Sequence, residues 1–144
     1  MKYREISEKL EPGNRRKEVL EVYGKKIEKG ETFGNLKGGE VKKLGGKKGL
    51  LLVKKEIDIW KELGVDVQKK ICKYKVENDE LVRKELFDSK GKVLIHPAMR
   101  VSESKLKDCF WEGRGIHTSD GVFTNVVLGG NVLGKLWMEI RDEL

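Results

Sequence analysis

The sequence has little cysteine, little proline and no long hydrophobic run. Its 144 residues include two cysteines and two prolines, and no apolar run approaches the ~20 residues that a membrane-spanning helix needs. Cys72 and Cys109 are too few for the disulfide framework that small secreted domains commonly use. The first residues are charged and lack the apolar stretch of a signal peptide. We therefore expect an intracellular, cytoplasmic protein without a membrane partner.

Motifs for nucleotides and metals are also absent. The glycine-rich segment 31–49 contains neither Gly-x4-Gly-Lys-[Ser/Thr] nor Gly-x-Gly-x-x-Gly, the spacings that cradle phosphates in nucleotide-binding loops. Cys72, His96, Cys109 and His117 are far apart in sequence, whereas zinc ligands typically come in close pairs. The sequence therefore predicts no cofactor and no bound metal.

The charge that is present is unevenly distributed. Residues 1–75 hold 21 Lys/Arg and 12 Asp/Glu, whereas residues 76–144 hold 10 Lys/Arg and 12 Asp/Glu, within a formal net charge of +7. A basic half is typical of a protein that binds a polyanion such as nucleic acid, or an acidic protein surface. A solvated surface of mixed sign is the alternative, because acidic residues are interleaved with the basic ones.

Helical spacing of apolar residues characterises the N-terminal third. It predicts helices over 3–10 and 15–29, separated by a turn. The Gly/Lys-rich segment 30–49 is predicted to form loops or a loose hairpin and to be flexible. Residues 50–63 fit a helix or a strand, and Gly64, a typical helix C-terminus, favours the helix.

Alternation of apolar and polar residues characterises the rest of the chain. It predicts a three-stranded meander made of Val67–Val76, Leu81–Phe87 and Val93–Val101. Two runs around Gly129-Gly130 predict a C-terminal hairpin, Val122–Leu128 with Val132–Ile140. Strands joined by short turns favour a meander over βαβ units. The fold prediction is a single α+β domain, 1–144, with N-terminal helices followed by a mainly antiparallel sheet.

The first functional hypothesis is a non-enzymatic nucleic-acid-binding protein, with RNA or a single strand favoured. Its basic N-terminal half would neutralise phosphates without reading bases. The predicted contact residues are Arg15, Arg16, Lys17, Lys42, Lys43, Lys47, Lys48, Lys69, Lys70 and Lys73. Phe33, Phe110 and Trp111 would supply stacking surfaces, with Tyr74 beside the lysines of the predicted strand.

A metal-dependent nuclease is the best-formed enzymatic alternative. Asp88 followed by Glu103 and Lys105 resembles the Asp…Glu-x-Lys pattern of restriction nucleases. In a strand, Glu103 and Lys105 would share a face, where carboxylates bind Mg²⁺ and the lysine steadies a hydroxide or a phosphate. His117, in the polar segment 113–121, is a separate candidate for a general base.

A protein partner is the remaining alternative. A small virus- or mobile-element-encoded protein that binds and modulates a host protein would also lack catalytic motifs. Phe110 and Trp111 are the candidate partner-binding residues, although aromatic pairs more often pack inside a core. The predicted strand Val132–Ile140 would permit a homodimer by sheet pairing.

Overall fold

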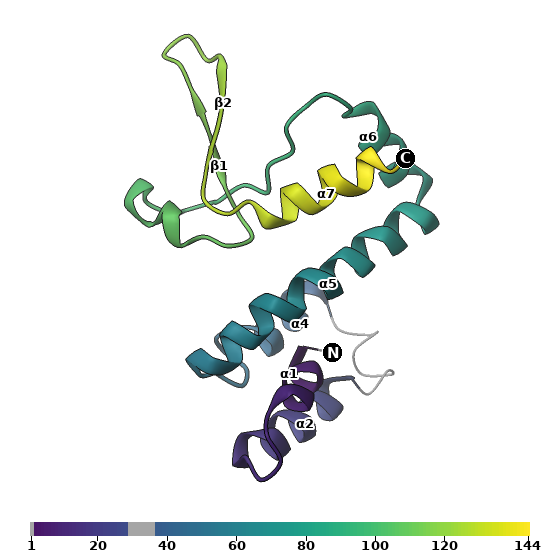
Figure 1. The fold of residues 1–144 in the computed structure, drawn as a ribbon, viewed down its shortest axis with the longest axis vertical. Helices are drawn as coiled ribbons and strands as arrows, with labels where there is room; N and C mark the ends of the chain where they lie inside the picture. Colours follow the sequence, from purple (N-terminus) through teal and green to yellow (C-terminus); the bar gives the residue numbers. More distant parts are fainter. Residues whose placement is uncertain (1, 29–36) are drawn as a thin grey trace. The chain divides into compact units, whose positions relative to one another are not determined.

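The chain divides into two compact units in the computed structural model, which describes residues 2–28 and 37–144. The units are Met1–Asp66 and Val67–Leu144, and the boundary lies within helix α5 (Lys54–Asn78) (Figure 1). The predicted flexible segment 30–49 lies partly outside the described residues. Each unit has its own apolar core.

The first unit begins with the two predicted helices, α1 (Lys2–Lys9) and α2 (Arg15–Glu28). Asn14 starts α2, because its side-chain oxygen accepts the Arg16 backbone N–H at 2.9 Å. Gly24 lets the two helices pack closely, since a Cβ there would stand 2.8 Å from Cγ of Arg4. The prediction of two N-terminal helices is confirmed.

The core of this unit contains residues from the α1 and α2 region, from the chain that precedes α5 and from the first part of α5. Its buried residues and the half-buried residues packed on them are Tyr3, Ile6, Leu10, Leu20, Tyr23, Ile27, Leu50, Leu52, Ile59 and Trp60. The helical spacing that the sequence shows in 3–10 therefore corresponds to a buried face.

Residues 38–45 form a helix, α4 (Gly38–Gly45), where the sequence predicted a loop or hairpin. Three of its eight residues are glycines, which disfavour helix by about 1 kcal/mol each. The carboxylate of Glu40 accepts the Lys37 backbone N–H at 3.0 Å at the first turn. Val41 and Leu44 are half-buried. Tertiary contacts at the last turn, described below, outweigh the poor helix propensity.

Helices α5 and α6 (Glu80–Asp88) replace the first two predicted strands, 67–76 and 81–87. Cys72 and Val76 are buried, whereas Tyr74 between them is exposed, which is the spacing of a helix face. Asp79 begins α6 directly, because its carboxylate accepts the backbone N–H groups of Leu81 and Val82 at 3.0 and 3.2 Å.

The predicted helix in 50–63 is confirmed from Lys54 onwards, but Gly64 does not end it. The third predicted strand, 93–101, is also wrong. The chain there is irregular, with one isolated bridge between Pro97 and Gly113. The 3-10 helix η1 (Glu103–Asp108) follows.

The antiparallel sheet consists of β1 (Arg114–His117) and β2 (Phe123–Leu128), with Arg114 opposite Leu128. The hairpin predicted between 122–128 and 132–140 is wrong, because Val132–Asp142 forms helix α7. The predicted homodimer depended on a strand at 132–140, and these residues form a helix instead.

Asn131 explains the change from strand to helix. It is buried, has a φ of 45°, accepts the His96 N–H at 2.9 Å and donates to the Leu94 carbonyl at 3.0 Å. The turn at Gly129-Gly130 therefore leads into α7 and against the irregular segment, not back along β2.

The second unit buries α5, α6 and α7 against one another. Its core residues and the half-buried residues around them are Cys72, Val76, Val82, Leu86, Leu94, Leu133, Trp137 and Ile140. The α+β class is confirmed, with N-terminal helices and a small antiparallel sheet near the C-terminus (Figure 1). None of the described helices is long and apolar enough to cross a membrane.

Candidate nucleic-acid interface

Positive charge is concentrated at the C-terminal end of α4. Lys42 and Lys43 lie in its last turn, and Lys47 and Lys48 follow it; we call these four residues the α4 corner. All four are exposed and none forms a hydrogen bond or ion pair with another described residue. Segment 41–49 contains no acidic residue. No other described residue therefore occupies the four ammonium groups.

A tight turn presents the second pair of lysines. The backbone N–H of Gly46 donates to the Lys43 carbonyl at 3.3 Å, and that of Gly49 donates to the Gly46 carbonyl at 3.1 Å. The second bond places Lys47 and Lys48 at the two central positions of the turn, where side chains project into solvent.

Side chains from α1 and α2 hold the end of α4 in place. The hydroxyls of Tyr3 and Tyr23 both donate to the Leu44 carbonyl, at 3.1 and 3.0 Å, and Lys2 Nζ donates to the Gly45 carbonyl at 2.5 Å. These bonds satisfy carbonyls that a helix C-terminus leaves without an intrahelical partner. The tyrosine rings meet edge-to-face, with centroids 4.8 Å apart. These contacts hold the α4 corner in position.

Burial of the side chains that hold the end of α4 shifts the pKa values of two of them. Desolvation lowers the pKa of Lys2. Desolvation also raises the pKa of Tyr3, with a further rise caused by the neighbouring Tyr23. The Tyr3 hydroxyl therefore stays protonated and keeps donating to Leu44 across the neutral range.

Gly49 allows the turn to lie close to the Leu44 carbonyl and the Tyr23 hydroxyl. A Cβ at this position would stand 2.1 Å from the Leu44 carbonyl oxygen and 2.6 Å from the Tyr23 hydroxyl. The glycine that the sequence presents as a loop residue is required by packing at the site.

The other predicted contact residues of the first unit differ in whether their charged groups already bind another part of the chain. Arg15 is exposed and has no partner among the described residues. Lys17 is half-buried, and its ammonium group donates to the Leu10 carbonyl at 3.2 Å. Arg16 is fully engaged in an ion pair with Glu56.

The Arg16–Glu56 pair is structural. Nε and Nη2 of Arg16 donate to the two carboxylate oxygens of Glu56 at 2.7 and 3.0 Å, and Nη2 also donates to the Leu51 carbonyl at 2.9 Å. Glu56 is only 1% exposed and accepts the Val53 N–H at 3.1 Å. The hydrogen bonds from Arg16 lower the pKa of Glu56, and the same contact raises the pKa of Arg16. Arg16 therefore has little capacity to bind phosphate.

The predicted contact residues of the second unit lie on α5, not on a strand. Lys69 forms an ion pair with Glu139 at 2.8 Å, and Lys73 forms one with Glu143 at 3.3 Å. Lys70 is exposed and has no partner among the described residues. The structure therefore leaves Arg15, Lys70 and the α4 corner available from the ten predicted residues.

The residues of the nuclease hypothesis lie on α6 and on η1. Asp88, at the end of α6, is paired with Lys84 at 2.6 Å. Glu103 and Lys105 lie on η1, so the shared strand face on which the hypothesis relied is absent. The described part of the chain contains no group of three or more His, Cys, Asp and Glu side chains that could hold a metal ion.

The candidate general base, His117, lies on the surface, and the thiol of Cys72 is buried. His117 is exposed on β1, and its ring lies 5.4 Å from the Phe123 ring, centroid to centroid. Cys72 is fully buried, and desolvation raises the pKa of its thiol. Among the described residues, no carboxylate is hydrogen-bonded to either side chain.

Two of the predicted stacking residues, Phe110 and Trp111, are not fully exposed. Phe110 and Trp111 are half-buried, with ring centroids 5.0 Å apart in an edge-to-face contact. Phe33 lies outside the described residues. Within residues 2–28 and 37–144 the exposed Phe and Tyr rings are Tyr74 and Phe87. The sequence places Tyr74 beside the lysines of a predicted strand, whereas it does not single out Phe87.

No protein-family model, curated protein or solved structure matches this chain.

Proposed function

We propose that this protein binds nucleic acid without catalysis and that the α4 corner supplies the main phosphate contacts. The observation that supports this function is the exposure of four neighbouring lysines, unpaired within the described chain, on a helix end that Tyr3 and Tyr23 hold in place. A backbone of phosphates at regular spacing suits such a cluster, because each ammonium group can neutralise one charge.

The proposal has a quantitative consequence. Each neutralised phosphate of a single strand adds about 0.7 to the slope of log K against log salt, so four contacts contribute roughly 2.8. Raising the salt from about 50 to about 250 mM should then weaken binding roughly a hundredfold through these four residues alone.

The test is a fluorescence-anisotropy titration of labelled single-stranded RNA, single-stranded DNA and duplex DNA over this salt range. The variant replaces Lys42, Lys43, Lys47 and Lys48 with glutamine. We expect weaker binding for every sequence and a salt slope reduced by roughly 2.8. Mg²⁺ is included and the probes are checked on a gel, because cleaved probe would support the nuclease instead.

The matched control removes the same charge from the second unit. It replaces Lys92, Lys105, Lys107 and Lys135, which are exposed lysines without an ion pair to a described residue. The control should keep the wild-type slope within about one unit. Equal slopes for both quadruple variants, or no binding by the wild type at the lower salt, would reject the proposed interface.

A protein partner is the second candidate function, favoured by a separate apolar groove in the second unit. This groove, of about 510 Å³, is lined by Leu81, Val82, Leu86, Leu94, Trp137, Glu85 and Ser89. Leu81 is 67% exposed at its edge. A partner protein that binds the wild type but not Leu81→Asp, in a system where nucleic acid does not bind, would favour this function.

A further inference from the structure

Two aromatic rings of the second unit lie on the surface. Tyr74 on α5 is 66% exposed and Phe87 on α6 is 52% exposed. Aromatic side chains bury a large apolar area when they enter a core or an interface. Exposure of both rings on ordered helices therefore indicates surfaces that a ligand could cover.

Each ring follows a cation by one helical turn. Lys70 precedes Tyr74, and Arg83 precedes Phe87, in both cases at i,i+4, where side chains are neighbours on the helix surface. The side chains of Lys70 and Arg83 form no hydrogen bond or ion pair with another described residue. The same pair, a free cation beside an exposed ring, thus occurs on two helices.

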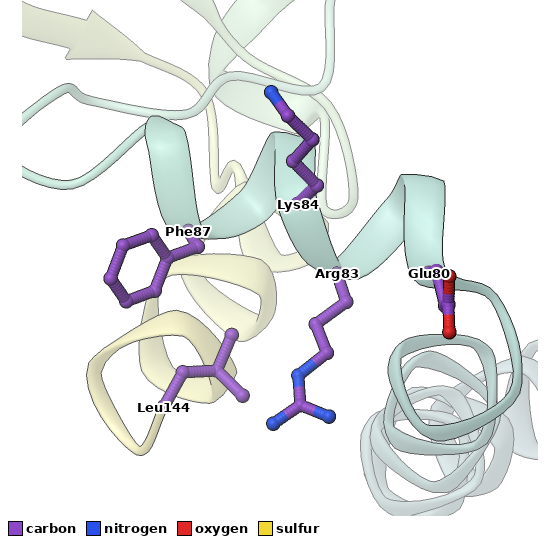
Figure 2. A pocket seen from close by; sticks show the side chains of 5 residues that line it. All are labelled: Glu80, Arg83, Lys84, Phe87 and Leu144. Carbon is purple, nitrogen blue, oxygen red and sulfur yellow. The ribbon is translucent and has the colours of Figure 1, made fainter.

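Phe87 also lines a surface pocket of about 490 Å³, together with Glu80, Arg83, Lys84 and Leu144. Figure 2 shows Phe87, Arg83 and Leu144 on one side of α6, with Lys84 directed to the other side. Lys84 is paired with Asp88, whereas the Arg83 side chain forms no ion pair with another described residue. A third cation, Lys90 Nζ, lies 4.2 Å from the centroid of the Phe87 ring.

We propose that Tyr74 and Phe87 stack on bases of a single-stranded nucleic acid, with Lys70 and Arg83 on the adjacent phosphates. A ring that offers a π-face beside a cation combines the two interactions by which proteins hold single strands. Bases within a duplex are stacked on one another, so only unpaired bases can reach the rings. This inference rests on the proposed function and specifies its ligand as single-stranded.

A protein ligand fits these surfaces less well. An apolar docking surface would have to desolvate Lys70 and Arg83, which have no acidic neighbour bound to them within the described chain. Lysine is depleted at protein–protein interfaces, although arginine is enriched there. Phosphates on either side of a stacked base supply the missing counter-charge.

The experiment compares Tyr74→Leu, Phe87→Leu and the double variant with the wild type, on a single-stranded RNA and on a duplex. Both positions are exposed, so leucine should leave the fold intact, which far-UV circular dichroism checks. Each substitution should weaken single-strand binding about five- to hundredfold and leave the salt slope unchanged, because stacking releases no counterions. Tyr74→Trp and Phe87→Trp should retain binding.

Substitution of the two cations tests the predicted phosphate contacts independently of the rings. Lys70→Gln with Arg83→Gln should lower the single-strand salt slope by about 1.4. If the wild type binds with a steep salt slope but the leucine variants bind like it, the stacking sites are wrong and the α4 corner stands. Equal loss on duplex and single strand would also overturn the stacking sites. Absence of any wild-type binding at low salt would reject both proposals.

Discussion

Removing Arg16 should destabilise the protein without removing a nucleic-acid contact. In Arg16→Met the carboxylate of Glu56, 1% exposed, keeps only the Val53 N–H and loses both charge-assisted hydrogen bonds. Such bonds contribute roughly 1.5–3 kcal/mol each, and leaving a buried charge without its partner costs about 3–5 kcal/mol. Because the Arg16 side chain is 32% exposed, water can partly replace it. We therefore expect a loss of about 2–3 kcal/mol in the free energy of unfolding.

The assay is urea denaturation, followed by circular dichroism and by the fluorescence of the tryptophans, of which Trp60 packs on the same core. A double-mutant cycle with Glu56→Gln isolates the pair. The double variant should be destabilised by at least about 1 kcal/mol less than the sum of the single variants, since a neutral amide at position 56 no longer needs the guanidinium. Strict additivity, or a loss below about 0.5 kcal/mol for Arg16→Met, would refute a structural role for the pair.

The same pair predicts a pH dependence. Arg16 lowers the folded-state pKa of Glu56 below its unfolded value of about 4.3. The stabilisation is therefore fully present above that unfolded value and is lost as pH falls through the folded pKa. Glu56→Gln should show a smaller loss of stability on acidification than the wild type. An identical acid profile for the two proteins would contradict this assignment.

Three further predictions concern other parts of the molecule. Gly49→Ala should destabilise the first unit by more than about 1 kcal/mol in urea denaturation and weaken RNA binding, because its Cβ meets the Leu44 carbonyl oxygen at 2.1 Å. Asp79→Ala should cost about 1 kcal/mol through loss of the α6 N-cap, and Asp79→Asn should retain most of that stability. A thiol reagent at neutral pH should modify Cys109 quickly in the native protein and Cys72 only after unfolding, because Cys72 is buried with a raised pKa; two equal fast phases would contradict this.

The local sequence was sufficient to predict the helices in which apolar spacing and capping residues indicate the same structure. Helices α1 and α2 both show helical spacing of apolar residues, and Asn14 caps the start of α2. Residues 72–76 satisfy two periods at once, because positions four apart share a face in a helix and also in a strand. The helix is distinguished from the strand by burial, because Cys72 and Val76 are buried whereas Tyr74 is exposed. The same ambiguity produced the wrong strand at 132–140, which the buried Asn131 resolves.

The sequence also determined that positive charge is concentrated in residues 1–75. It did not determine which cations are free, because Arg16 meets Glu56, and Lys69 meets Glu139, across separations of 40 and 70 residues. Helix α4 likewise depends on hydroxyls from α1 and α2 that reach the Leu44 carbonyl across 41 and 21 residues. Charge and periodicity are properties of neighbouring residues and are visible in a sequence. Pairing and burial arise from contacts between distant residues, so only the tertiary structure decides them.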